Sequence, residues 1–177
     1  MEHIAEKFEG ATILVVDDEP FLLSILCARL SGFGARILTA ENGQQALDHV
    51  KSEQIDAILT DIDMPVMTGL EFLSKIRELG YLTPVVILTG QGDHTNMLTA
   101  LRLGASDFLD KPFDSAVVNE VMVKALRLGM ASRTMEEKLA SGGGEPSQIS
   151  LDEFRRWKSA VVANAASAPL PKPKYGR

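Results

Sequence analysis

Six residues of this 177-residue sequence could do chemistry together: the acidic pair Asp17-Asp18, the acids Asp61 and Asp63, Thr89 and Lys111. Three carboxylates brought to one place would repel one another, so such a cluster persists only if a cation or several donors compensate it. Ligands that are all oxygen point to Mg²⁺. This ion needs only one or two carboxylates and keeps several waters, which leaves a position for a phosphoryl oxygen.

Lys111 would add a positive charge opposite such a metal, and Thr89 would add a hydroxyl donor. Together they could hold a phosphoryl group on Asp61, because phosphoryl transfer depends mainly on positioning and charge neutralisation. Each piece alone has an ordinary alternative. The acidic pair before Pro20 could be a helix N-cap, Thr89 could cap the next helix, and Lys111-Pro112 could be a surface turn.

The elements that must position these residues alternate along the chain. Short β-branched runs predict strands, apolar throughout and so buried on both faces, at residues 11–18, 35–40, 56–61, 84–90 and 106–111. Apolar residues at three-and-four spacing predict helices at 21–30, 43–50, 70–79, 96–104 and 116–126. Glycines at 34, 80 and 104 fall where helices should stop. The pattern predicts an α/β fold with a doubly wound parallel sheet.

That architecture explains why buried strands end on polar residues. In an open parallel sheet, ligands bind outside the carboxyl ends of the strands. The first, third, fourth and fifth predicted strands end in Asp17-Asp18, Asp61, Thr89 and Lys111. The sequence therefore predicts one site at this edge of the sheet.

Four motifs resemble the receiver domain of two-component response regulators, over about residues 10 to 128: VVDDEP, LTDIDMPVMTGLEFL, VVILTG and GASDFLDKPF. The resemblance implies a flavodoxin-like five-stranded sheet of order 2-1-3-4-5. It also implies phosphorylation of Asp61 by a histidine kinase or a histidine phosphotransfer protein. Such a protein is no enzyme in role, because it catalyses only its own phosphorylation and dephosphorylation.

The resemblance also implies roles for single residues. Asp18 and Asp61 would bind Mg²⁺ directly, Asp17 would help through water, and Asp63 would give its backbone carbonyl. Thr89 and Lys111 would contact the phosphoryl group. Phe108 would be the switch aromatic, with the readout on the fourth helix, fifth strand and fifth helix. The bond between Lys111 and Pro112 is often cis in relatives, and Asp63 with Gln91 would tune the phosphoryl lifetime.

A haloacid-dehalogenase-like phosphatase is a remote alternative, because Asp61-Ile-Asp63 also fits that family's pair of a nucleophile and an acid. Chain order argues against it. In that family the extra acidic pair follows the lysine, whereas here Asp17-Asp18 precede the nucleophile.

Composition divides the chain. Residues 1–128 hold 10 basic and 19 acidic residues, whereas residues 129–177 hold 8 and 5. We expect a lead at 1–9, the receiver at 10–128, a helix end and Gly-rich linker at 129–149, an amphipathic helix at 150–166, and a Pro/Lys-rich tail at 167–177. The N-terminus lacks a signal-peptide pattern and no apolar run is long enough to span a membrane, so the predicted location is cytoplasmic.

The C-terminal segment leaves the output open. The predicted C-terminal helix carries an apolar stripe formed by Leu151, Phe154, Trp157 and Val161. We expect this stripe to dock on a receiver domain, within one chain or across a homodimer. A homodimer through the face from the fourth to the fifth helix is another option. We expect output through a downstream protein partner, and the acidic main domain argues against nucleic acid and membrane as partners. The alternative is that the basic C-terminal helix binds nucleic acid or membrane.

Overall fold

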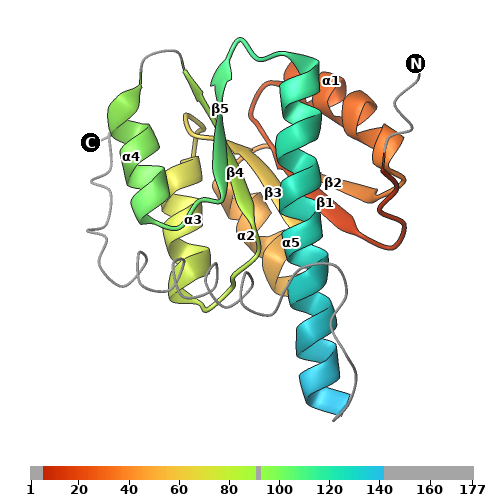
Figure 1. Ribbon diagram of the computed structural model, residues 1–177. Coiled ribbons are helices and arrows are strands. Elements are labelled where there is room, and N and C mark those ends of the chain that lie inside the picture. The colour runs from red at the N-terminus through yellow and green to blue at the C-terminus, as the bar shows by residue number, and fades with distance from the viewer. Residues whose placement is uncertain (1–5, 91–92, 142–177) are drawn as a thin grey trace.

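The computed structural model describes residues 6–90 and 93–141. Five parallel strands form one sheet in the order β2-β1-β3-β4-β5 (Figure 1). Their bounds are Thr12–Val16 for β1, Arg36–Ala40 for β2, Ala57–Asp61 for β3, Val85–Gly90 for β4 and Asp107–Lys111 for β5. This confirms the flavodoxin-like order expected from the sequence.

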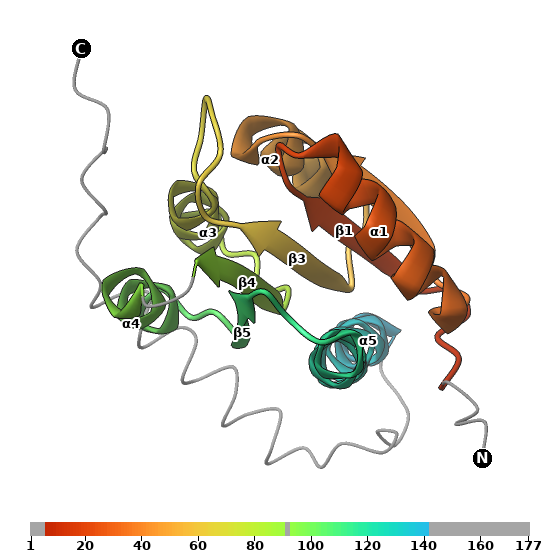
Figure 2. The same ribbon diagram turned by 90° about the horizontal axis from the view of Figure 1, so that it is seen from above.

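Helices cover both faces of the sheet, as Figure 2 shows from above. Helix α1 (Pro20–Leu30) and helix α5 (Ser115–Ser141) share one core with one face of the strands. Helices α2 (Gly43–Ser52), α3 (Gly69–Glu78) and α4 (His94–Arg102) close a second core on the opposite face. The apolar periodicity of each helix therefore has a partner surface, which is the main source of helix stability in a protein.

Local signals set the ends of the helices. Helix α3 begins with a capping box between Thr68 and Glu71, and Asn42 accepts hydrogen bonds from the first turn of α2. The predicted stops are confirmed, because the glycines at 34, 80 and 104 have positive φ angles of 70°, 86° and 83°. The bond between Lys111 and Pro112 is cis, as the resemblance implied.

The expectation that all five strands are buried on both faces is wrong for the two edge strands. Every residue of β1 and β3 is buried, because each has a strand on both sides and helices on both faces. Strands β2 and β5 have one neighbour each, and Arg36, Thr39 and Asp110 on them are exposed.

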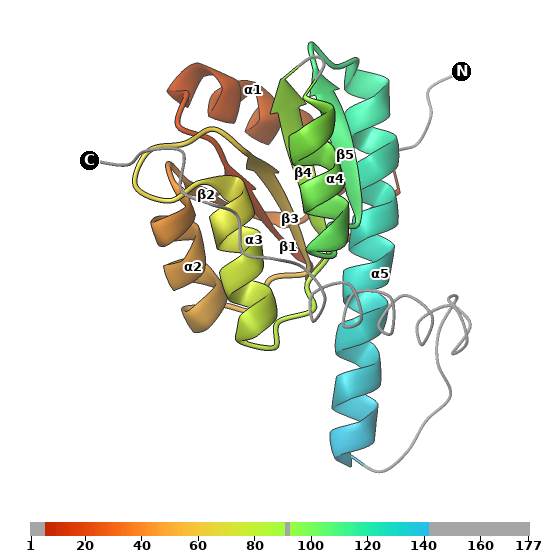
Figure 3. The ribbon, with the colours of Figure 1, turned by 90° about the vertical axis from the view of Figure 1, so that its left-hand side faces the viewer.

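Helix α5 continues through Gly129 to Ser141 and projects beyond the sheet (Figure 3). The predicted domain boundaries, including the one at residue 128, stay predictions. Several predicted features lie outside the described residues: Gln91, the end of the predicted linker, the helix at 150–166 and the tail at 167–177. Within the described part of the chain, none of the helices has the length and apolar character needed to cross a membrane.

Candidate functional site

The ends of three strands bring Asp17, Asp61 and Lys111 together. Strands β1 and β3 are direct neighbours, so the residues that follow Val16 and Thr60 meet at one edge. Lys111 ends β5, next to Gly90 of β4. Its Nζ atom lies 2.8 Å from Oδ1 of Asp61 and 3.3 Å from Oδ2 of Asp17. One ammonium group therefore bridges two carboxylates from different strands.

The two bridged carboxylates are taken out of water. Asp17 is 0% exposed and Asp61 is 7% exposed. Burial raises the pKa of Asp61, and the hydrogen bond and charge of Lys111 lower it. The negative charges of Asp17 and Asp63 raise it further, so the net pKa of Asp61 lies above its ordinary value. Burial is thus the largest effect on this pKa, and the nearby lysine offsets only part of the increase.

Backbone N–H groups fix the second oxygen of each acid. The N–H of Glu19 donates to Oδ1 of Asp17 at 2.9 Å, and the N–H of Asp63 donates to Oδ2 of Asp61 at 3.1 Å. The side chains of Asp18 and Asp63 are exposed beside them. The four predicted acids thus divide into two buried carboxylates held by Lys111 and two that face solvent.

Thr89 lies at the same edge of the sheet as this cluster, and Phe108 lies three residues before Lys111 on β5. Thr89 is 1% exposed near the end of β4, and its hydroxyl donates to the carbonyl of Gly90 at 3.4 Å. Leu88, the residue before it, pairs with Asp61 in the sheet, which places Thr89 at the same edge. Phe108 lies on β5, half-buried, against the core formed with α2, α3 and α4.

The sequence pattern gave Gly69 no role at the site. A Cβ atom on Gly69 would lie 2.0 Å from the carbonyl oxygen of Asp61, and the Gly69 N–H donates to Ile62 at 2.9 Å. Only glycine lets α3 begin this close to the backbone of the acid. The sequence signal that could have indicated this role is a glycine eight residues after the acid that ends a predicted strand.

The loop between β3 and α3 also holds an unusual backbone. Val66 has a φ of 68°, and the Met67 N–H donates to the carbonyl of Pro65 at 2.7 Å. A β-branched residue rarely adopts a positive φ, because its Cβ substituents crowd the backbone. Nothing in the sequence pattern indicated this turn.

The donors fit a hard divalent cation in their chemistry. Among the described residues, no three His, Cys, Asp or Glu side chains converge as a ready-made metal cage. Mg²⁺ does not need one, since it binds through one or two carboxylates and keeps its waters. Asp61 and the neighbouring acids Asp17, Asp18 and Asp63 offer such oxygens at one edge.

Comparisons with known proteins agree on one family. The model of the "Response regulator receiver domain" family matches residues 13–123. The transcriptional regulatory protein GlrR of Escherichia coli K12 is 30% identical over 155 residues, which is 88% of this chain and 30% of that protein. The transcriptional regulatory protein CpxR of the same strain is 34% identical over 134 residues, 76% of this chain and 56% of that protein. The matched part of this chain thus spans about a third to a little over half of these relatives.

Solved structures give the same result. The receiver domain of a response regulator from Clostridium thermocellum is 32% identical, with a TM-score of 0.61, and the match covers 66% of this chain and 94% of that one. The structure titled FixJ-N is 28% identical with a TM-score of 0.63, covering 68% of this chain and 96% of that one.

Proposed function

The chain belongs to the response regulator receiver domain family, and we propose that Asp61 is its phosphoryl acceptor. The observation that carries the proposal is the buried bridge in which Lys111 Nζ contacts both Asp61 and Asp17. The haloacid-dehalogenase-like alternative is given up, because the family match covers residues 13–123 and so includes all six predicted residues.

The proposed reaction is an in-line transfer to a carboxylate. One oxygen of Asp61 attacks phosphorus, and the bond between phosphorus and the donor's leaving atom breaks, with the electron pair departing on the donor. Asp61 must be ionised to attack, and the nearby ammonium of Lys111 favours that form. Bound Mg²⁺ would neutralise charge on the phosphoryl oxygens; Asp61, Asp18 and the Asp63 carbonyl would hold it, with Asp17 acting through water.

Transfer would redirect the lysine. Without a phosphoryl group, the Lys111 ammonium contacts two carboxylates. In the phosphorylated state alone, a phosphoryl oxygen would become a new partner for this ammonium. Thr89 would turn its hydroxyl from the Gly90 carbonyl toward the phosphoryl group. Phe108 would then follow into the space that Thr89 leaves, altering the surface of α4, β5 and α5.

The proposed donor is a histidine kinase or a histidine phosphotransfer protein, and the proposed output is binding of a downstream protein. In this role the chain modifies its own side chain and turns over no separate substrate. A second output has some support. GlrR and CpxR are named transcriptional regulatory proteins. These relatives therefore do not support the expectation that nucleic acid is no partner. A gel shift that weakens steeply with salt would favour DNA binding by the complete protein.

The acceptor is tested by incubating the full chain with Mg²⁺ and a small acyl phosphate and measuring its intact mass. The wild type should gain one phosphoryl group, and Asp61→Asn should gain none, because an amide is a poor nucleophile. Asp18→Ala should need more Mg²⁺ for the same labelling. Asp48→Asn, at an exposed site on α2, is the matched control. Labelling of Asp61→Asn to the wild-type extent would refute the assignment.

A further inference from the structure

A third buried acid lies at the opposite end of β3 from Asp61. Asp56 directly precedes the strand and is 1% exposed. Its Oδ2 accepts a hydrogen bond from the Thr12 N–H at 2.8 Å and another from Nη1 of Arg133 at 3.0 Å. The Arg133 guanidinium also donates to the carbonyl of Gly10 at 3.2 Å. Arg133 comes from the projecting half of α5, so this contact joins that helix to the base of the sheet.

Helix α5 also packs tightly against the residue that precedes β3. A Cβ atom on Gly129 would lie 1.7 Å from the carbonyl oxygen of Asp56 and 3.1 Å from its Cα. The glycine in mid-helix is therefore a packing requirement. Gly129 and Arg133 are four residues apart, so both face Asp56 from one side of the helix.

Beyond this contact the helix leaves the body of the protein. The side chains of Glu136 and Glu137 are exposed. A hollow of about 250 Å³ lies beside the contact, lined by Arg133, Asp56 and the turn from Gly80 to Pro84. The core residues of α5 from Val118 to Leu126 hold the first half of the helix against the sheet. Further along, beside the hollow, the ion pair and the glycine contact tie the helix to the residue that precedes β3.

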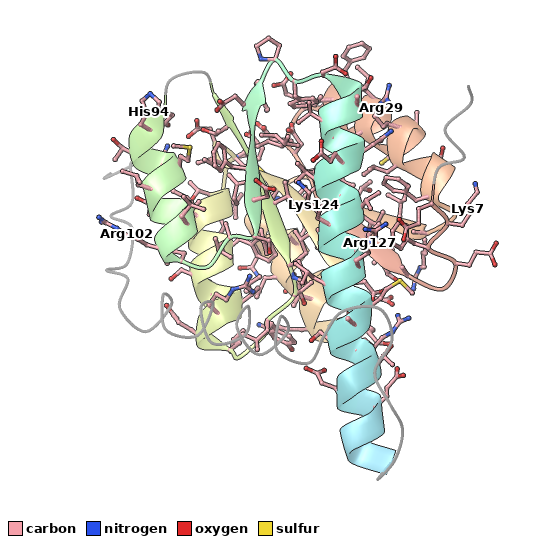
Figure 4. All side chains as sticks on the ribbon, viewed as in Figure 1. Lys7, Arg29, His94, Arg102, Lys124 and Arg127 are labelled. Carbon is pink, nitrogen blue, oxygen red and sulfur yellow. The ribbon has the colours of Figure 1, made fainter. Side chains whose placement is uncertain are left out.

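A second ion pair on α5 is exposed to solvent, unlike the pair between Asp56 and Arg133. Arg127, labelled in Figure 4, pairs with Glu6, and both side chains are open to solvent. Such surface pairs contribute little, since water screens them. Breaking a buried pair leaves an uncompensated charge and is strongly unfavourable.

We propose that Asp56 and Arg133 form a latch that sets the direction in which α5 leaves the receiver. The last described turn of α5, which ends at Ser141, is then positioned from the base of β3, the strand that carries Asp61 at its other end. Because all five residues of β3 are buried, the strand is a stiff connection between the latch and the acceptor site.

The latch is tested by the distance distribution between spin labels on cysteines placed at Lys51 and Glu136 in the full-length Cys27→Ser chain. Both label sites are exposed. Arg133→Met keeps the length of the side chain and removes its charge, and Asp56→Asn keeps its shape. Each should broaden the distribution clearly. Arg127→Met, on the same helix, should leave it unchanged.

Amide hydrogen exchange over residues 130–141 is the second measurement. We expect exchange about tenfold faster in Arg133→Met and at the wild-type rate in Arg127→Met. A cooperative thermal melt shows that each variant is folded, and if one variant fails to fold, the other decides. A distance distribution unchanged in the folded latch variants overturns the proposal, whatever the exchange rates.

Discussion

Lys111 Nζ lies 2.8 Å from Oδ1 of Asp61, so the proposed acceptor is paired with a cation before any phosphoryl group arrives. The same ammonium lies 3.3 Å from Asp17. Two buried acids that share one base are costly to the fold, because each charge was removed from water.

Asp61→Asn should raise stability at pH 7. The net pKa of Asp61 is raised in the folded state, first by burial. A raised pKa means that ionisation costs stability as pH climbs from about 4, the unfolded value, through the folded pKa. The amide removes that cost, so we expect a gain of about 1 kcal/mol that vanishes below roughly pH 4. Thermal melts at both pH values, with Asp48→Asn as control, check this.

Lys111→Met should have the opposite effect. It leaves Asp17 and Asp61 buried without their shared cation, and we expect a loss of about 2 kcal/mol at pH 7. The loss should shrink as acid protonates Asp61, whose pKa is raised by burial. Urea unfolding across pH measures it, and a loss that is equal at pH 7 and pH 4 would contradict the electrostatic cause.

Thr89→Val keeps the shape of a buried side chain and removes its hydroxyl. If the hydroxyl donates to the phosphoryl group, phosphorylation by a small donor should slow by about tenfold or more. Thr89→Ser should retain most of the rate. Equal rates for the Val and Ser variants would remove Thr89 from the proposed chemistry.

Gly129→Ala should destabilise the protein, although alanine is the better helix former. The added methyl group would overlap the Asp56 carbonyl, and overpacking of this kind costs about 1 to 3 kcal/mol. The control is Gly32→Ala, since a Cβ atom on Gly32 would meet nothing within 4 Å. Denaturant titration should show a lower midpoint for the Gly129 variant alone.

Val66→Asn should stabilise the loop after Asp61. Val66 is 83% exposed and has a φ of 68°, so it loses strain and little packing when replaced. Asparagine tolerates this conformation, and a gain of about 1 kcal/mol is expected. Val117→Asn on α5 is an exposed comparison that should change stability little. A Val66 variant no more stable than wild type would show that the turn carries no such cost.

The strands, the helices between them and the edge of the sheet at which the site lies could all be predicted from the sequence. The change between strand and helical periodicity located all five strands, and polar residues at four strand ends predicted Asp61 and Lys111 as neighbours. These inferences succeed because periodicity is local, and because parallel strands put their carboxyl ends at one edge.

Which groups are buried and which distant residues meet could be learned only from the folded structure. Asp17 lies under Lys111 while its neighbour Asp18 faces solvent. Arg133 reaches Asp56 across 77 residues, and Gly129, whose local effect is to weaken a helix, is what allows that approach. Local propensity describes only how a residue suits the helix or strand in which it lies. Burial, ion pairing and close contact depend on segments that meet only when the sheet and its helices have assembled.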